Sequence, residues 1–488
     1  MAGDNLKMSA ILIQAAATMA IAYLTSLTGF IYAWPSYTVA NFRSNNTVLS
    51  SPMSTLEVSL LGSFTNIGAL VVTPMCGYVI DKLGRKYSAM LFGLPYVISW
   101  GIIAVTRSVP VVIACVALAG VGAAGQAVSS VYIGEICHES IRGALTSTIA
   151  SGYFIGLLFS YILGGYLTYH QVVYVHLSLS VLYMLLLMLL KESPVYLMQN
   201  GKEQEAAESI AFYRRVDVTS KEVEIEIGKI KLQLDPRIDQ ILEANNTEQR
   251  AVEGLIEKPP IEEAKTESAW AFLKKSKSSR RALLAVIMVI SLTILMGSIV
   301  LQVYAETLFQ EAVPTMSANM CSIFLAIDYL IAALICGSML DKFGRKFLLT
   351  TTSIASGIFC LLLGSQLQFR WGPHWFTAFC IYGYSFVYNL GAGVVPFVLT
   401  AEVFLPEIRG FGNSVSMAFM WIINFVTLVI FNPLAESIGL GPLFYLFSMV
   451  CFIGAIYSQC CLPETKGLTV DAIQLVFLDR KAQRISKK

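Results

Sequence analysis

The sequence has little charge and few of the residue patterns on which enzymes depend. Only 14% of its 488 residues are charged and 56% are hydrophobic, with a mean hydropathy of +0.65, whereas soluble domains carry about 25% charged residues. It has four histidines, and no nucleotide-binding loop or metal-spaced histidine cluster. We therefore expect a membrane protein that is not an enzyme and uses no metal or other cofactor. Its net charge of +2 gives no indication of a nucleic-acid partner.

The ten cysteines do not form a disulfide framework. Nearly all fall inside apolar runs, no CxxC motif occurs, and the loops expected to face outward contain no obvious pair. Cys460 and Cys461, near the end of the last apolar run, fit either small packing residues or acylated cysteines.

Long apolar runs dominate the chain. A charge-free run of about twenty residues is long enough to cross the hydrocarbon core of a bilayer. Twelve such runs occur, six on each side of a polar block at 192–280. They lie at roughly 10–33, 57–80, 87–106, 110–134, 144–168, 171–190, 282–305, 316–340, 347–368, 374–400, 412–432 and 441–462. We therefore expect an all-α membrane protein with twelve transmembrane helices.

Three charged motifs occur twice, in the same order, once in each half of the chain. The pairs are DKLGRK at 81–86 with DKFGRK at 341–346, EICHESIRG at 135–143 with EVFLPEIRG at 402–410, and, more weakly, ESP at 192–194 with PET at 463–465. Such duplication predicts two pseudo-symmetric six-helix bundles, and duplicated membrane proteins are mostly transporters.

The basic residues predict the orientation in the membrane. With a cytosolic N-terminus, the outward loops contain only Arg43, Arg107 and Arg370 of the 34 basic residues, in accord with the excess of Lys and Arg on the cytosolic side of membrane proteins. We expect a multi-pass plasma-membrane protein with both termini cytosolic. The sequon Asn45-Asn46-Thr47 then faces outward, and Asn45 is a predicted glycosylation site.

The polar block divides the chain into four expected parts. These are an N-terminal bundle at 1–191, a cytosolic linker with short helices at 192–280, a C-terminal bundle at 281–462 and a cytosolic tail at 463–488.

The repeated charged motifs predict a conformational latch. Arg–carboxylate pairs are strong where solvent is limited, so we expect two clusters that hold the halves together on the cytosolic side and break when that side opens. The alternative is that the charges only enforce topology. The predicted latch residues are Asp81, Arg85, Lys86, Glu135, Arg142, Asp341, Arg345, Lys346, Glu402 and Arg409.

Together with PETKG at 463–467, these motifs resemble the sugar porter family of the major facilitator superfamily across all twelve runs. Spans one, two and five resemble the insect facilitated trehalose and hexose transporters most closely. The resemblance implies two six-helix bundles, a sugar site at mid-membrane between them, and alternating access.

The resemblance carries over only part of the family's sugar site. Positions that hold amide or indole side chains in the family fall here on Ala150, Thr293, Ile294, Ile299, Tyr329, Phe397 and Met420. Asn389, Trp421 and Asn424 keep useful chemistry, and Gln302 and Tyr304 are candidate replacements along span seven. The predicted substrate-binding residues are therefore Asn389, Trp421, Asn424, Phe397, Thr293, Gln302, Tyr304 and Tyr329.

Asp328 is an ionisable residue within the predicted span 316–340. An ionisable side chain costs free energy inside a membrane and usually faces a cavity or a partner. Asp328 is therefore either a possible ion-coupling site or a hydrogen-bonded residue near the water-filled opening of the pathway that has no role in transport. The acid in span one and the arginine in span four of proton-coupled sugar porters are both missing here. Downhill uniport is therefore the simpler interpretation.

The leading interpretation is a facilitative carrier of a sugar, trehalose or hexose-like, or of a polyol, which functions as a monomer in the lipid bilayer. One alternative is a non-transporting receptor or sensor whose pocket has lost its hydrogen-bonding groups. The other is a carrier of a less polar solute, suggested by the isoleucine, alanine and methionine substitutions in the site.

Overall fold

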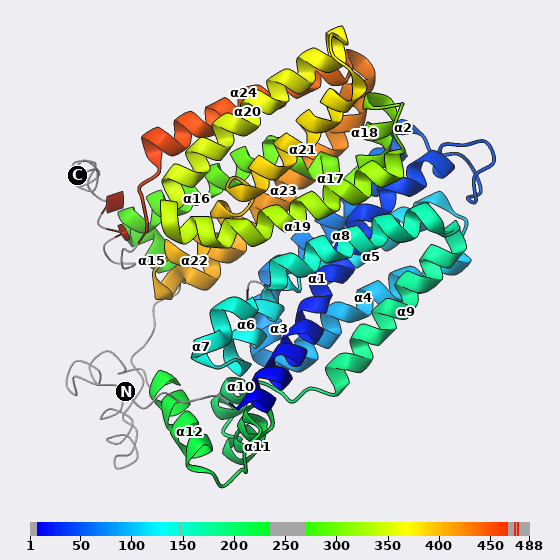
Figure 1. The fold of residues 1–488 in the computed structure, drawn as a ribbon. Coiled ribbons are helices and arrows are strands. Elements are labelled where there is room, and N and C mark those ends of the chain that lie inside the picture. The colour runs from blue at the N-terminus through cyan, green and yellow to red at the C-terminus, as the bar shows by residue number, and fades with distance from the viewer. Residues whose placement is uncertain (1–6, 147, 235–268, 467–472, 475, 478–488) are drawn as a thin grey trace.

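The computed structural model describes residues 7–146, 148–234, 269–466, 473–474 and 476–477 (Figure 1). These residues form helices joined by turns and loops, and they contain no strand. The N-terminal half and the linker consist of α1 (Met8–Phe42), α2 (Thr55–Val72), the 3-10 helix η1 (Thr73–Met75), α3 (Cys76–Leu83), α4 (Arg85–Val105), α5 (Val109–Ala123), α6 (Gln126–Ile136), α7 (Glu139–Thr146), α8 (Thr148–Tyr166), α9 (Tyr169–Met188), α10 (Pro194–Gln199), α11 (Glu203–Arg214) and α12 (Lys221–Leu234).

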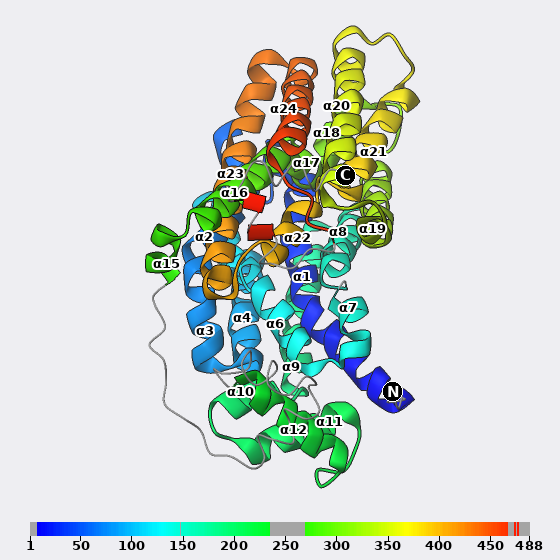
Figure 2. The ribbon, with the colours of Figure 1, turned by 90° about the vertical axis from the view of Figure 1, so that its left-hand side faces the viewer.

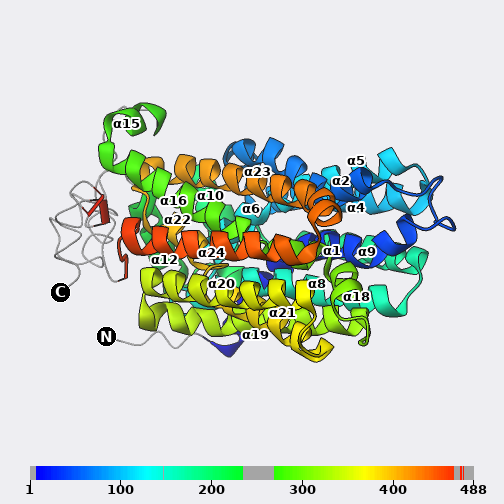
Figure 3. The ribbon, with the colours of Figure 1, turned by 90° about the horizontal axis from the view of Figure 1, so that it is seen from above.

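The C-terminal half has the same number of long helices. It consists of α15 (Ala269–Lys275), α16 (Lys277–Leu295), α17 (Ser298–Val303), α18 (Ala305–Ala312), α19 (Ala318–Phe343), α20 (Arg345–Phe369), α21 (His374–Leu390), α22 (Val395–Glu402), α23 (Pro406–Ile438) and α24 (Leu440–Cys461). Figure 1 shows the two halves side by side, and Figure 2 shows the linker helices α10–α12 at the lower end of the N-terminal half. Figure 3 shows the long helices α19, α20, α23 and α24 running in roughly the same direction.

Twelve helical segments among the described residues are long and apolar enough to cross a bilayer, six on each side of the linker. This confirms the predicted all-α fold of twelve transmembrane helices. Span one is longer than the sequence predicted: it ends at Phe42 rather than near 33. Ser36, Thr38 and Asn41 weaken the hydropathy signal there, but the helix continues through them.

Span seven differs from the single run predicted at 282–305. Its helix stops after Leu295, and Gly297 has a φ of +91°, a left-handed conformation that ends an α-helix and that glycine adopts at little cost. Two short helices, α17 and α18, continue the chain. Hydropathy does not reveal this break because the residues on both sides of Gly297 remain apolar.

Glycines allow spans two and four to pack backbone against backbone. A Cβ built on Gly68 would lie 1.8 Å from the carbonyl oxygen of Ala117, and one on Gly120 would lie 1.9 Å from that of Thr65. No side chain fits at either position, so the two spans form one tightly packed unit.

The linker helices dock on the N-terminal half. Gln14 in α1 donates to the backbone carbonyl of Tyr213 in α11 and accepts from the backbone N–H of His138, at 3.1 and 2.8 Å. The Tyr213 hydroxyl in turn donates to the carbonyl of Lys191 at 2.7 Å. We call this end of the bundle the linker end, and the opposite end, with residues 43–54, the distal end.

Candidate functional site

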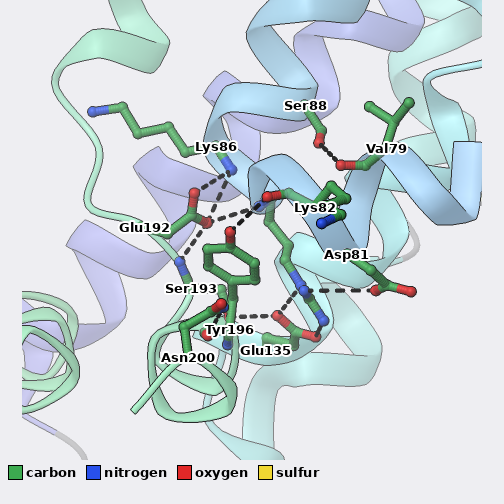
Figure 4. A network of polar contacts seen from close by, with 11 residues as sticks. Val79, Asp81, Lys82, Lys86, Ser88, Glu135, Glu192, Ser193, Tyr196 and Asn200 are labelled. Carbon is green, nitrogen blue, oxygen red and sulfur yellow. Dashed lines mark hydrogen bonds and ion pairs between the residues drawn. The ribbon is translucent and has the colours of Figure 1, made fainter. Parts of the chain in front are cut away.

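At the linker end of the N-terminal half, the predicted latch residues form a compact charge cluster (Figure 4). Arg85, the first residue of α4, donates two hydrogen bonds to the carboxylate of Glu135 at the end of α6, both of 2.8 Å. The Arg85 side chain is only 5% exposed and that of Glu135 only 16%. Asp81 lies at the edge, with an oxygen 3.9 Å from Arg85, and Ser193 donates a hydrogen bond to Glu135.

Glu192 joins this cluster to the linker. Its carboxylate accepts the backbone N–H groups of Arg85 and Lys86, at 2.9 and 3.0 Å. These groups have no partner within α4 because they lie in its first turn. Burial raises the pKa of Glu192, while the N–H donors of Lys86, Ser193 and Arg85 lower it. Lys86 Nζ donates to the carbonyl of Leu190 at 2.7 Å, so both residues that follow the turn at Gly84 are held in place.

The C-terminal half repeats the arrangement. Arg345 donates to Glu402 at 2.6 Å, and Thr465 donates to the other oxygen of Glu402 at 2.9 Å. Glu464 accepts the backbone N–H groups of Arg345 and Lys346, at 2.9 and 3.1 Å. Glu464 and Thr465 thus occupy the positions of Glu192 and Ser193, as the weak ESP and PET echo predicts.

Each cluster joins spans of its own half in this structure. The Arg85 cluster links α3, α4, α6 and the start of the linker, and the Arg345 cluster links α20, α22 and the segment after α24. Their role as a latch between the halves therefore stays a prediction.

Two predicted latch residues lie outside these clusters, and a third is not described in full. The helix breaks at Cys137 between α6 and α7, so Arg142 does not lie beside Glu135 and instead donates to the carbonyl of Cys137 at 3.4 Å. Arg409 is exposed and makes no ion pair within the described part of the chain. The side chain of Asp341 lies outside the described residues.

Near the middle of the bundle, Gln302 in α17 connects the two halves. Tyr153 in α8 donates to the side-chain oxygen of Gln302 at 2.7 Å, and Tyr161 donates to its backbone oxygen at 2.5 Å. Tyr32 in α1 stands edge-on to Tyr153, with ring centroids 6.1 Å apart, and donates to Asn66 at 2.8 Å. Hydroxyl and amide groups from four spans therefore meet at one level.

Further contacts between the halves lie toward the distal end. Tyr304, which stacks on Phe431 within the C-terminal half, donates to the carbonyl of Val58 in the N-terminal half at 3.4 Å. Asn432 donates to Ser59 at 3.2 Å. At the surface, Arg43 and Thr55 both donate to Glu436, at 3.3 and 2.9 Å. The N–H of Glu306 donates to Ser36 at 2.8 Å. The distal end is thus held closed by hydrogen bonds between the halves.

The amino-acid sequence matches the family model for "Sugar (and other) transporter" over residues 10–477. The chain belongs to this family. The facilitated trehalose transporter Tret1 of Culex quinquefasciatus is 26% identical over 473 residues, covering 94% of this chain and 85% of that protein. Tret1 of Polypedilum vanderplanki is 25% identical, covering 96% and 88%. Tret1 of Aedes aegypti is longer, and the match spans 55% of it.

Solved structures of the family share the fold. The xylose transporter XylE from E. coli in a partially occluded inward open conformation has a TM-score of 0.74 at 20% identity, covering 94% of this chain and 100% of that chain. The inward open conformation of XylE has a TM-score of 0.73 at 18% identity, covering 96% and 99%.

The structure places the predicted sugar-binding residues of this sugar transporter in two groups. Gln302, Tyr304 and Tyr329 contact the N-terminal half, and Tyr329 stacks on Phe154 of α8 with ring centroids 5.5 Å apart. Trp421 also crosses to that half, because its indole N–H donates to Thr73 at 3.0 Å.

The second group lies on the helices of the C-terminal half. Asn389 is 3% exposed and donates to the carbonyl of Ser385 at 2.9 Å. Thr293 donates back to α16, to the carbonyls of Val289 and Ile290, both at 3.0 Å.

Asn424 and Phe397 differ from the other predicted residues. Asn424 in α23 is 8% exposed, and its side chain makes no hydrogen bond within the described part of the chain. Phe397 is 43% exposed.

Asp328 is half-buried between α19 and α21. Its carboxylate accepts a hydrogen bond from Ser385, the residue whose backbone carbonyl accepts from Asn389. The acid thus has a protein partner and is connected to a predicted site residue through Ser385.

Tyr153, Tyr161 and Tyr32 are the polar groups at the centre that sequence reasoning missed. Tyr153 and Tyr161 lie three and eleven positions after Ala150, a spacing that places them on the same face of one helix. The resemblance to the family points to that face only at Ala150, where the family has an amide. The spacing of Tyr153 and Tyr161 from Ala150 is the sequence signal that could have identified them.

Proposed function

We propose that this chain carries a neutral sugar or polyol, trehalose or hexose-like, down its concentration gradient across the plasma membrane by alternating access. Membership of the family, relatives named as trehalose transporters and a fold shared with a xylose transporter support the sugar class. The uncoupled mode is supported by the lack of an acid in span one and of a basic residue in span four.

The asymmetry between the two ends of the bundle carries this proposal. At the distal end and at mid-membrane, hydrogen bonds such as Tyr153–Gln302 and Asn432–Ser59 join the halves. At the linker end, the strong ion pairs Arg85–Glu135 and Arg345–Glu402 close within each half. The halves can separate at the linker end without loss of these pairs, as alternating access requires.

The polar groups at the centre suit a polyhydroxylated ligand. Hydroxyl and amide side chains both donate and accept, which is what sugar hydroxyls need, and Trp421 offers a flat apolar face for the C–H surface of a sugar ring. With the distal end closed, Gln302 accepts hydrogen bonds from the two tyrosines, whereas the Asn424 side chain has no hydrogen-bond partner among the described residues. We propose Asn389, Trp421 and Asn424 as the core of the site, with Thr293, Gln302, Tyr304, Tyr329 and Phe397 around it.

The proposed orientation places the linker end in the cytosol. Asn45 is exposed in the loop between α1 and α2, at the distal end beside Arg43, so a carbohydrate chain fits there. In wild-type protein, glycosidase treatment should increase the mobility on a gel, and Asn45→Gln should abolish this shift. If glycosidase-sensitive mass persists in Asn45→Gln, the glycan lies elsewhere.

The decisive experiment is uptake of labelled trehalose, glucose and a polyol panel in oocytes, beside mock-injected cells. We expect saturable uptake of at least one compound, and its loss in Asn424→Ala at equal surface abundance. Asn200→Ala, which removes an exposed amide of the linker, is the matched control and should transport normally. If none of the compounds enters above the mock level although the protein is at the surface, the carrier proposal is wrong.

A further inference from the structure

The linker end of span twelve carries two adjacent cysteines. All ten cysteines lie in the described residues, and eight of them are buried, while Cys460 and Cys461 are exposed. These two are the last residues of α24. Thiols next to the end of a transmembrane helix are in the position where membrane proteins are S-acylated.

Cys460 continues an exposed apolar stripe along α24. Met449, Ile453 and Ile456 are 52%, 45% and 64% exposed. Together with Cys460 they follow the spacing i, i+4, i+7 and i+11, which places residues on one face of an α-helix. The stripe is about 16 Å long at 1.5 Å per residue.

This stripe faces lipid and not the space between the halves. The opposite face of α24 packs mainly against α20, within the C-terminal half. Figure 1 shows α24 on the side of that half away from the N-terminal half. An acyl chain attached to Cys460 would therefore continue directly along an apolar surface already in the bilayer.

Cys461 points in a different direction. It is rotated by about 100° from Cys460 around the helix axis. The residue one turn earlier on its side is Tyr457, which is half-buried, whereas Ile456 precedes Cys460. The two cysteines thus share the same depth but not the same access to the stripe.

Directly after the pair the chain enters a charged layer. Lys346 Nζ donates to the carbonyl of Leu462, and Lys466 Nζ donates to that of Lys342, both at 2.8 Å. The thiol of Cys460 therefore stands at the boundary between the apolar stripe and lysines. Those lysines favour the approach of an acyl donor that carries phosphate groups.

We propose that the Cys460–Cys461 pair is an S-acylation site and that Cys460 is the acceptor of a long-chain fatty acyl group. The Cys460 thiolate attacks the carbonyl carbon of a long-chain acyl-coenzyme A. A new thioester S–C bond forms, the S–C bond to coenzyme A breaks, and coenzyme A leaves as a thiol with the proton that Cys460 lost. The proposal rests on the proposed orientation, which places this end in the cytosol, where acyl-coenzyme A is available.

The test uses the full chain expressed in insect cells that are fed an alkynyl analogue of palmitate. After click labelling we expect a signal on the protein that hydroxylamine removes, since hydroxylamine cleaves thioesters. Cys460→Ser should lower this signal at least fivefold. Cys461→Ser, the matched control, should retain most of it. Full labelling of Cys460→Ser, or loss of the label in Cys461→Ser alone, would overturn the assignment to Cys460.

Two further measurements distinguish failure of the acylation proposal from failure of the proposed orientation or of the proposed transport function. A membrane-impermeant maleimide should reach hydroxylamine-treated Cys460 only after the cells are permeabilised, and reaction in intact cells would overturn the orientation and with it the acylation proposal. Sugar uptake is measured on the same cells. Acylation at Cys460 without uptake leaves the present proposal intact and contradicts only the proposed function.

Discussion

At the scale of single residues, Glu192 and Glu464 explain why the two charge clusters hold their shape. Each carboxylate lies at the start of a transmembrane helix and accepts two of its first backbone N–H groups. An anion at a helix N-terminus is favourable because of the helix dipole, by about 0.3–1 kcal/mol at exposed positions. Since each glutamate follows the last span of its half, it also fixes that span to the third span of the same half.

The first prediction concerns the buried arginines of these clusters. Arg85→Ala leaves Glu135 without its bidentate partner, and breaking a buried pair in this way costs about 3–5 kcal/mol. We expect strongly reduced transport and lower thermal stability for Arg85→Ala and Arg345→Ala in an active preparation. Arg409→Ala is the control and should match the wild type, because it removes an exposed arginine that forms no ion pair with any described residue. Full transport rates in both cluster variants would show that the charges serve topology alone.

Asp328 gives the second prediction at this scale. Uptake should not depend on a proton gradient, because the chain lacks the acid of span one and the arginine of span four. We expect unchanged initial uptake after a protonophore, and Asp328→Asn should behave in the same way because asparagine can still accept the hydrogen bond of Ser385. Protonophore-sensitive uptake that disappears in Asp328→Asn would instead make Asp328 the coupling site.

At the scale of elements, the break in span seven divides the helix into two functional pieces. α16 packs within the C-terminal half. Gln302 in α17, Tyr304 between α17 and α18, and Glu306 in α18 instead form hydrogen bonds with the N-terminal half. Gly297 is the joint between these pieces, with its left-handed φ of +91°. Contacts between the halves can thus form or break through α17 and α18 without displacing all of span seven.

We predict that Gly297→Ala impairs this joint. An L-residue in the left-handed region costs about 1–2 kcal/mol, and the added Cβ would also lie 2.7 Å from the ring of Phe447. Thermal stability and the maximal rate of uptake should both fall. Gly337→Ala in α19 is the control, since a Cβ there has no atom within 4 Å. Equal melting temperatures and rates for the two variants would contradict a strained joint at Gly297.

The elements also show what the sequence could and could not predict. The repeated motifs predicted the clusters, including the equivalence of Glu192 and Glu464, because charged residues are rare enough in this chain for a recurrence to be visible. The break at Gly297 was invisible because hydropathy carries no information on φ. Tyr153 and Tyr161 were missed because tyrosine is abundant in the spans, and only helical spacing distinguishes those at the centre.

At the scale of the whole molecule, each half is tightly packed within itself, and the halves meet mainly where α2 contacts α23 and α8 contacts α19. Spans two and four approach at the distance of backbone contact through Gly68 and Gly120, and each charge cluster fixes further spans within its half. The bonds between the halves are instead single hydrogen bonds or an exposed ion pair, Arg43–Glu436. Exposed ion pairs contribute about 0–1 kcal/mol, so the contacts between the halves should break before the contacts within each half.

We predict that a covalent bridge across the distal end arrests transport. Ser59 and Asn432 are hydrogen-bonded across the halves at 3.2 Å, so Ser59→Cys with Asn432→Cys should accept a short thiol cross-linker. Uptake should stop on cross-linking and return on reduction if the linker is cleavable. The control pair is Thr350→Cys with Ser458→Cys, which lies within the C-terminal half at 3.0 Å. Undiminished uptake in the bridged Ser59–Asn432 variant would rule out opening of the distal end.

The length of α1 has a mechanical consequence. With 35 residues at 1.5 Å each it is about 52 Å long, well beyond the hydrocarbon core of about 30 Å. Ser36 bonds to α18 near its distal end, and Gln14 bonds to α11 at its linker end. We infer that α1 connects the two ends mechanically. If α1 tilts when the distal end opens, the linker helices docked at its other end, about 33 Å away, should move with it. We therefore expect the docking of the linker helices to change when the distal end opens.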